Sequence, residues 1–158
     1  RRGTYVANIS IRDINEVFEI RTTLDALASG LAAERITEEE LEQLERLLVS
    51  IGENIETRNM KKVVEDDMEF HDILYKASRN QRLVGIISNL REQMTRFRSM
   101  SMSYPGRLKK TLEEHSRLVE AIAQRDVELA QKLAVEHMEN SEQTLLIDME
   151  AIHQARKE

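Results

Sequence analysis

The chain contains a single proline, Pro105, and five glycines among its 158 residues. Proline removes a backbone donor and glycine raises the entropic cost of ordering, so these two residues interrupt helices more than any others. They form one strong break, at Ser103-Tyr104-Pro105-Gly106. Charged residues make up 33% of the chain and tryptophan is absent, which also favours helices over strands. The sequence therefore predicts an all-α fold.

Apolar residues recur at helical spacing in six segments, and polar residues that can cap a helix precede several of them. We expect capping boxes at Asp13/Glu16 and Thr37/Glu40, and an N-cap at Asp126. The expected helices cover residues 13–35, 38–55, 59–77, 80 to the break at 103–106, 105–124 and 126–155. Short connections place consecutive helices antiparallel, so we expect a bundle of about six to seven helices.

Composition excludes several classes of function. The chain has no cysteine, so disulfides and thiolate metal sites are ruled out. No apolar run approaches the roughly 20 residues that a membrane span needs. A net charge of -6 gives no general attraction to phosphates, so this part of a protein is not expected to bind nucleic acid by itself. We expect a cytoplasmic chain with no membrane partner.

Three of the four histidines, together with one carboxylate, have spacings that suit a metal site. Asp67 and His71 are four residues apart on one predicted helix, about 40° apart around its axis. His115 and His137 would be about 33 Å apart on a straight helix. The predicted break at 125–126 lies almost midway between them, so antiparallel packing would bring them level.

These four residues offer one carboxylate and three imidazoles, a donor set suited to Zn²⁺, Ni²⁺, Mn²⁺ or Fe²⁺. Two alternatives remain open on spacing alone. The histidines could be solvated surface residues of a metal-free interaction bundle. A metal with open coordination positions could also activate water in an enzyme. Against an enzyme, there is no HExxH motif, and only Glu150-Ala151-Ile152-His153 has the ExxH spacing of a di-iron bundle.

Three segments carry a family resemblance: FEIRTTLDALASGLAAERIT (18–37), DMEFHDILYKASRN (67–80) and EEHSRLVEAIAQRDVELAQKLAVEHM (113–138). They resemble the effector-binding domain, often called FCD, of FadR-type transcription regulators in the GntR family. The resemblance implies an all-helical, non-enzymatic sensor that forms homodimers. Its metal-binding branch uses one Asp and three His, which match Asp67, His71, His115 and His137. The acyl-CoA-binding branch has generally lost these ligands, so the resemblance points to a small carboxylate effector.

The same resemblance implies a winged-helix DNA-binding domain upstream, which would contact operator DNA. Residues 1–9, with the sequence RRGTYVANI, are then the remnant of its wing strand and linker, and residues 10–158 form the helical domain. Asp25 departs from the family pattern, which usually has Glu four residues after the arginine that matches Arg21.

Arg21 is the first candidate for binding the effector, because a guanidinium can hold a carboxylate through two parallel hydrogen bonds. The alternative is that Arg21 only pairs with Asp25, four residues later on the helix surface. Further candidates share a polar face of the helix that begins at residue 80: Asn89, Gln93 and Arg96. Arg98 and Arg107 would serve equally well. A metal that organises the bundle and presents open positions to a carboxylate is the predicted mechanism.

Overall fold

The computed structural model describes residues 11–155, except for the side chains of residues 95–101, 103, 148 and 151–155. Six α-helices occupy this part of the chain. They are α1 (Ile11–Arg35), α2 (Glu38–Glu56), α3 (Met60–Ala77), α4 (Gln81–Ser103), α5 (Arg107–Ala123) and α6 (Val127–Ala155). The predicted all-α fold is confirmed. The predicted wing strand at residues 1–9 lies outside the described residues.

Local capping explains where most of these helices begin. The Thr37 side chain accepts from the Glu40 amide while Glu40 accepts from the Thr37 amide, so the predicted capping box is present. Asp126 caps α6 by accepting from the amide of Leu129 at 3.0 Å, as predicted. The box predicted at Asp13 is wrong, because α1 begins at Ile11 and Asp13 lies inside its first turn.

The break at 103–106 ends α4 as expected, but the next helix begins later than Pro105. Gly106 is the N-cap of α5, with a left-handed φ of 80° that glycine adopts without steric cost. Pro105 therefore lies in the turn before the helix rather than in its first turn.

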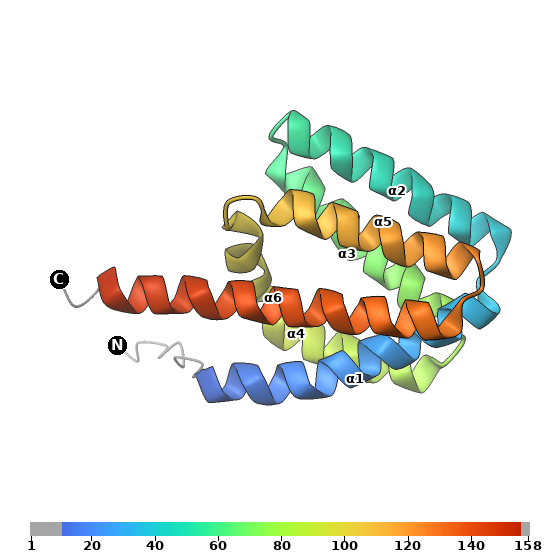
Figure 1. The fold of residues 1–158 in the computed structure, drawn as a ribbon, viewed down its shortest axis with the longest axis horizontal. Helices are drawn as coiled ribbons and strands as arrows, with labels where there is room; N and C mark the ends of the chain where they lie inside the picture. The colour runs from blue at the N-terminus through green and yellow to red at the C-terminus, as the bar shows by residue number, and fades with distance from the viewer. Residues whose placement is uncertain (1–10, 156–158) are drawn as a thin grey trace, which may run out of the picture.

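Helices distant in sequence are brought together by α6, which lies along both α1 and α5 (Figure 1). Gly30 of α1 faces Gln131 of α6 so closely that an added Cβ would be 2.7 Å from the Gln131 side-chain nitrogen. The larger apolar cluster joins all six helices around Phe70, Leu74 and Ile122. A smaller one surrounds Phe18 and Met138 between α1, α4 and α6. Among the described residues, no helix is long and apolar enough to cross a membrane.

Candidate metal centre and adjoining cavity

The four predicted ligands converge from three helices. Asp67 and His71 lie one turn apart on α3, His115 is on α5 and His137 is on α6. The reversal between α5 and α6, where Arg125 has a φ of 58°, brings the last two level as expected. One ring nitrogen from each histidine lies within 4.8 Å of those of the other two. Asp67 Oδ1 is 3.9 Å from His71 Nε2 and 3.7 Å from His115 Nδ1.

These distances can be compared with the size of a metal site. In a tetrahedral site, ligand atoms that each lie about 2.1 Å from one ion are about 3.4 Å apart. The two Asp67 contacts, at 3.9 and 3.7 Å, exceed that separation by about 0.3 to 0.5 Å, and the histidine nitrogens, which lie within 4.8 Å of one another, would approach by at most about 1.4 Å on metal binding. Burial, and then the charges of nearby His115 and Arg91, lower the pKa of His71 well below its ordinary value. His71 is therefore a neutral imidazole at pH 7, the form that binds metal. The donor set fits a divalent ion.

His137 is oriented by a carboxylate. Its Nδ1 lies 2.7 Å from Glu114 Oε2, a charge-assisted hydrogen-bond distance. With Glu114 ionised, Nδ1 carries the proton and donates it, which leaves Nε2 as the lone-pair donor to a metal. A histidine held in this way by an outer carboxylate is the usual arrangement around protein-bound metals.

Glu114 is in turn held by α5 and α6. Arg107 donates to both of its oxygens, at 2.9 and 3.0 Å, and Asn140 donates to Oε1 at 2.9 Å. Burial alone would raise the pKa of Glu114, but the hydrogen bonds and charges of His137 and Arg107 outweigh burial and lower it. The carboxylate is therefore ionised, and its orientation is set by four contacts.

A second hydrogen-bonded chain connects His71 to α1. The Tyr75 hydroxyl is 3.3 Å from His71 Nδ1 and donates a short hydrogen bond to Asp25. Arg21 Nη2 donates to Asp25 Oδ2 at 3.2 Å. The predicted Arg21–Asp25 pair is present, but it is buried rather than on the helix surface. Desolvation, and then the negative charge of Asp25, raise the pKa of Tyr75, so its hydroxyl stays protonated.

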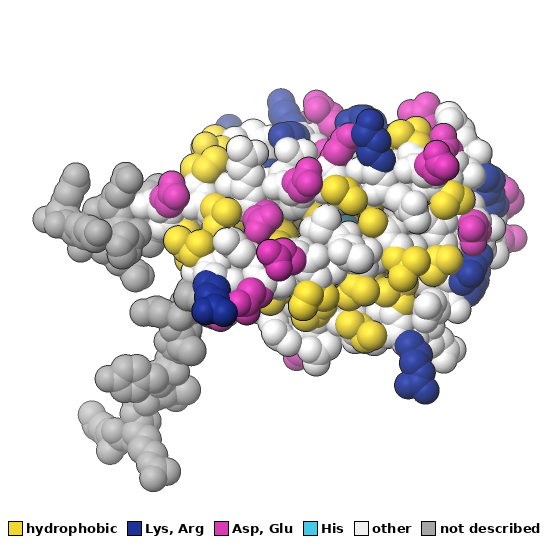
Figure 2. Space-filling model, turned by 60° about the horizontal axis from the view of Figure 1, so that its bottom comes forward, with side chains coloured by type: hydrophobic (Ala, Val, Ile, Leu, Met, Phe, Trp, Pro, Cys, Tyr) yellow, Lys and Arg dark blue, Asp and Glu magenta, His cyan; other side chains and the backbone are white. Residues whose placement is uncertain are grey.

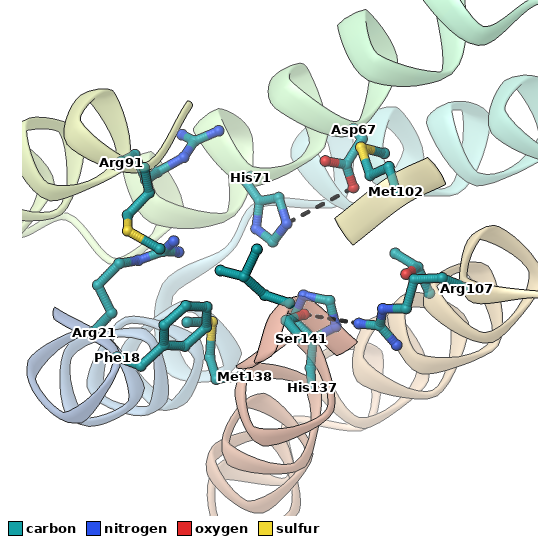
Figure 3. Close-up of a pocket in the computed structure, with 13 residues that line it drawn as sticks. Phe18, Arg21, Asp67, His71, Arg91, Met102, Arg107, His137, Met138 and Ser141 are labelled. Carbon is teal, nitrogen blue, oxygen red and sulfur yellow. Dashed lines mark hydrogen bonds and ion pairs between the residues drawn. The ribbon is translucent and has the colours of Figure 1, made fainter. Parts of the chain in front are cut away.

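A cavity of about 80 Å³ adjoins the ligands (Figure 3). Arg21 and Arg91 lie on one side of His71, and Arg107 with Ser141 lies on the other. The remaining lining is largely apolar: Phe18, Met94, Met102, Met138 and Leu145. The site thus combines metal-ligand chemistry with cationic and apolar walls, which suits a small amphipathic anion.

The predicted effector residues fall into two groups. Arg21 lines the cavity. Asn89 and Gln93 are exposed, hydrogen-bond to each other at 2.9 Å and are not among the residues that line it. Their side chains project about 140° and 100° around α4 from Met94, which marks the inward face. The side chain of Arg96 lies outside the described part of the chain.

Several site residues were not identified from the sequence as binding residues. Arg91 lines the cavity from α4, the Tyr75 hydroxyl lies 3.3 Å from His71 Nδ1, and Glu114 orients His137. A signal for Glu114 was present: it precedes His137 by 23 residues across the same reversal that pairs His115 with His137. Arg107 was an unresolved alternative, and the structure places it in the lining.

Comparison with known proteins gives a consistent result. The profile of a family described as "FCD domain" matches residues 16–140. The HTH-type transcriptional repressor RspR of Escherichia coli is 27% identical over 139 residues, which cover 88% of this chain and 61% of RspR. The chain spans about three fifths of the length of the curated relatives it matches.

Solved structures share the fold. E. coli McbR/YncC superimposes with a TM-score of 0.77 at 24% identity, over 89% of this chain and 66% of that one. The metal-free FCD domain of TM0439 superimposes with a TM-score of 0.75 at 18% identity, over 92% of this chain and 99% of that domain.

Proposed function

This chain belongs to the FCD domain family, and the relatives that it matches are HTH-type transcription regulators of the GntR type. We propose that the chain is the metal-binding and effector-sensing part of such a regulator. The prediction that the chain is not an enzyme is confirmed by this family. In the proposal, the whole protein acts in the cytoplasm and contacts operator DNA through a winged-helix domain. Two copies of the helical domain form a homodimer.

The proposed metal ligands are Asp67, His71, His115 and His137, and zinc is the first candidate, with nickel, manganese or iron as the others. The observation that carries the proposal is that these side chains, from three helices, converge beside the cavity that Arg21 lines. A bound divalent ion would supply positive charge and open positions for an effector carboxylate. Arg21 would hold the same carboxylate from α1.

The protein's own residues explain how binding could be transmitted. Arg21 is on α1, whereas the ligands are on α3, α5 and α6, so one small carboxylate would connect four helices. Its binding would favour one packing of α1 against the others. A coupling of about 1–3 kcal/mol between effector and operator would change operator affinity roughly 5- to 150-fold.

Exposed apolar side chains support the dimer proposal. Ile20 and Leu27 on α1 are 52% and 42% exposed, and Ile86 on α4 is 53% exposed. Figure 2 shows a face of the molecule on which hydrophobic side chains gather among charged ones. Such patches are commonly covered by a partner chain.

The metal proposal is tested by elemental analysis of protein that was never exposed to a chelator. We expect close to one equivalent of metal per chain. His115→Ala and His137→Ala should each lose most of it and unfold at a lower temperature, while His153→Ala, which changes the one histidine outside the cluster, should retain it. Wild-type metal retention by both cluster variants would refute the assignment of these ligands, whereas less than about half an equivalent of metal in the wild-type chain would favour a metal-free helical module.

The effector proposal is tested by thermal shift of the zinc-loaded chain with small carboxylates. A ligand at 100 times its Kd stabilises the folded chain by about 2.7 kcal/mol, which corresponds to a shift of roughly 5 to 11 °C for a chain of this size. Arg21→Ala should reduce the shift. A ligand whose affinity is the same in that variant would refute the role of Arg21.

A further inference from the structure

The charges around the cavity are already largely balanced within the chain. Each of the three arginines in its lining forms an ion pair with a carboxylate: Arg21 with Asp25, Arg91 with Asp72 and Arg107 with Glu114. The Arg107–Glu114 pair is bidentate, and Arg21 has a further contact with the Tyr75 hydroxyl. The guanidinium groups can still donate hydrogen bonds to a ligand, but they bring no excess of positive charge to it.

Binding of a divalent ion beside Asp67 would leave the site with one net positive charge. Asp67 is the one carboxylate among the four ligands, and it cancels one of the two charges of the ion. Among the described residues that line the cavity, the charges then sum to one unbalanced positive charge, which a ligand can neutralise. One carboxylate neutralises it. A second carboxylate would be removed from water without a counter-charge, which is strongly unfavourable in a buried site.

Most of the remaining cavity lining is apolar, and Thr111 and Ser141 are its polar exceptions. Phe18, Met94, Met102, Met138 and Leu145 are between 1% and 8% exposed, and they come from α1, α4 and α6. Three of the five are methionines, whose unbranched thioether side chains adapt to the shape of an apolar ligand. A short alkyl group attached to the metal-bound carboxylate would replace water against these side chains.

The arginines are already paired, and the side chains of Phe18, Met94, Met102, Met138 and Leu145 form an apolar wall of the cavity. We therefore propose that the effector is a monocarboxylate that carries a short apolar chain, and not a dicarboxylate. Its carboxylate would lie on the metal and near Arg21, and its chain against Met94 and Met138. This inference rests on the proposed function, because it names the class of ligand for the same site.

The test compares three ligands by calorimetry on the zinc-loaded chain at pH 7: acetate, butanoate and succinate. Butanoate adds two methylene groups to acetate, and at about 0.8 kcal/mol each it should bind roughly 15-fold more tightly. Succinate has the same number of carbons as butanoate but a second negative charge, and it should bind at least about 10-fold more weakly than butanoate.

The outcomes separate the two proposals. If the chain binds zinc and succinate binds as tightly as butanoate, or butanoate no more tightly than acetate, this inference is refuted and the carboxylate site stands. If none of the three ligands binds, the proposed carboxylate site itself fails, and the inference fails with it.

Two variants of nearly the same size test the apolar wall directly. Met94→Gln places an amide where the alkyl chain would lie, so butanoate should lose most of its roughly 15-fold advantage over acetate. Met94→Leu keeps an apolar side chain and should preserve the advantage. Met102→Gln is a second substitution at the same wall if Met94→Gln does not fold, as judged by its thermal midpoint without ligand. An equal loss for acetate and butanoate in a folded Gln variant would contradict the proposed placement.

Discussion

Glu114→Gln should be the most informative single substitution, because it removes one charge and leaves the shape of the side chain almost unchanged. In the native chain Glu114 accepts hydrogen bonds from Arg107, Asn140 and His137. A glutamine offers only one acceptor oxygen, and its amide group turns two donors toward the donors already present. The substitution therefore breaks the outer support of His137 and also removes the counter-charge of Arg107.

The expected loss of stability follows from burial. Arg107 is 4% exposed and Glu114 is 8% exposed, so the guanidinium would stay buried without its ionic partner. Removing one member of a buried pair typically costs about 3–5 kcal/mol. In a chain of this size this corresponds to a fall in Tm of roughly 6 to 20 °C. Loss of an outer partner of a metal-binding histidine should weaken zinc binding by about 10- to 100-fold.

The assay measures the Tm of the metal-free chain by calorimetry, and the zinc Kd by competition with a chromophoric chelator. Glu113→Gln is the matched control, since Glu113 is the adjacent residue on α5 and is exposed. The control should change stability by no more than about 0.5 kcal/mol and should bind zinc as the wild type does. If Glu114→Gln matched the control in both measurements, the assignment of Glu114 as the residue that orients His137 would be refuted.

Three further outcomes are expected. Tyr75→Phe removes the hydroxyl between His71 and Asp25, so zinc affinity should fall about 10-fold, whereas Tyr104→Phe, at an exposed residue, should leave the zinc Kd unchanged. The pKa of His71 is lowered by burial and then by nearby charges, so below about pH 6.5 the unfolded metal-free chain binds a proton that the folded chain does not. Its free energy of unfolding should therefore decrease as the pH falls from 7 to 5, and a Tm independent of pH over that range would contradict this. Thr37→Ala should lower the free energy of unfolding by about 1 kcal/mol in urea titrations and leave zinc affinity unchanged. A measurable loss of zinc affinity in this variant would show that the capping box is coupled to the site.

The helix boundaries could be predicted to within one or two residues because the interactions that set them are local. The Thr37 and Asp126 side chains each contact an amide three residues away, so the relevant partners are visible in a short stretch of sequence. The start of α1 was predicted two residues late, because Asp13 and Glu16 have the spacing of a capping box but lie inside the helix. A local pattern can thus show that a cap is possible without showing that it is used.

The convergence of the four candidate ligands was also predictable, because it depends on two simple geometric facts. Residues four apart share a helix face, and residues at equal distances from a reversal become level in an antiparallel pair. Asn89 and Gln93 show the limit of such reasoning. Their polar character suggested a binding face, but Met94 and Ile87, both buried, show that α4 turns the opposite side inward.

The sequence by itself determined six helices, most of their boundaries and a group of one carboxylate and three imidazoles, since helical periodicity and capping act over a few residues. Tertiary structure alone decided which charges meet between helices. Glu114 of α5 reaches His137 and Asn140 of α6, and Arg91 rather than Asn89 lines the cavity from α4 and pairs with Asp72 of α3. Those pairings depend on how each helix is rotated about its axis and how closely it packs on its neighbours. That rotation is set by the packing of the whole apolar core, and it determines the charge balance from which the class of effector is inferred.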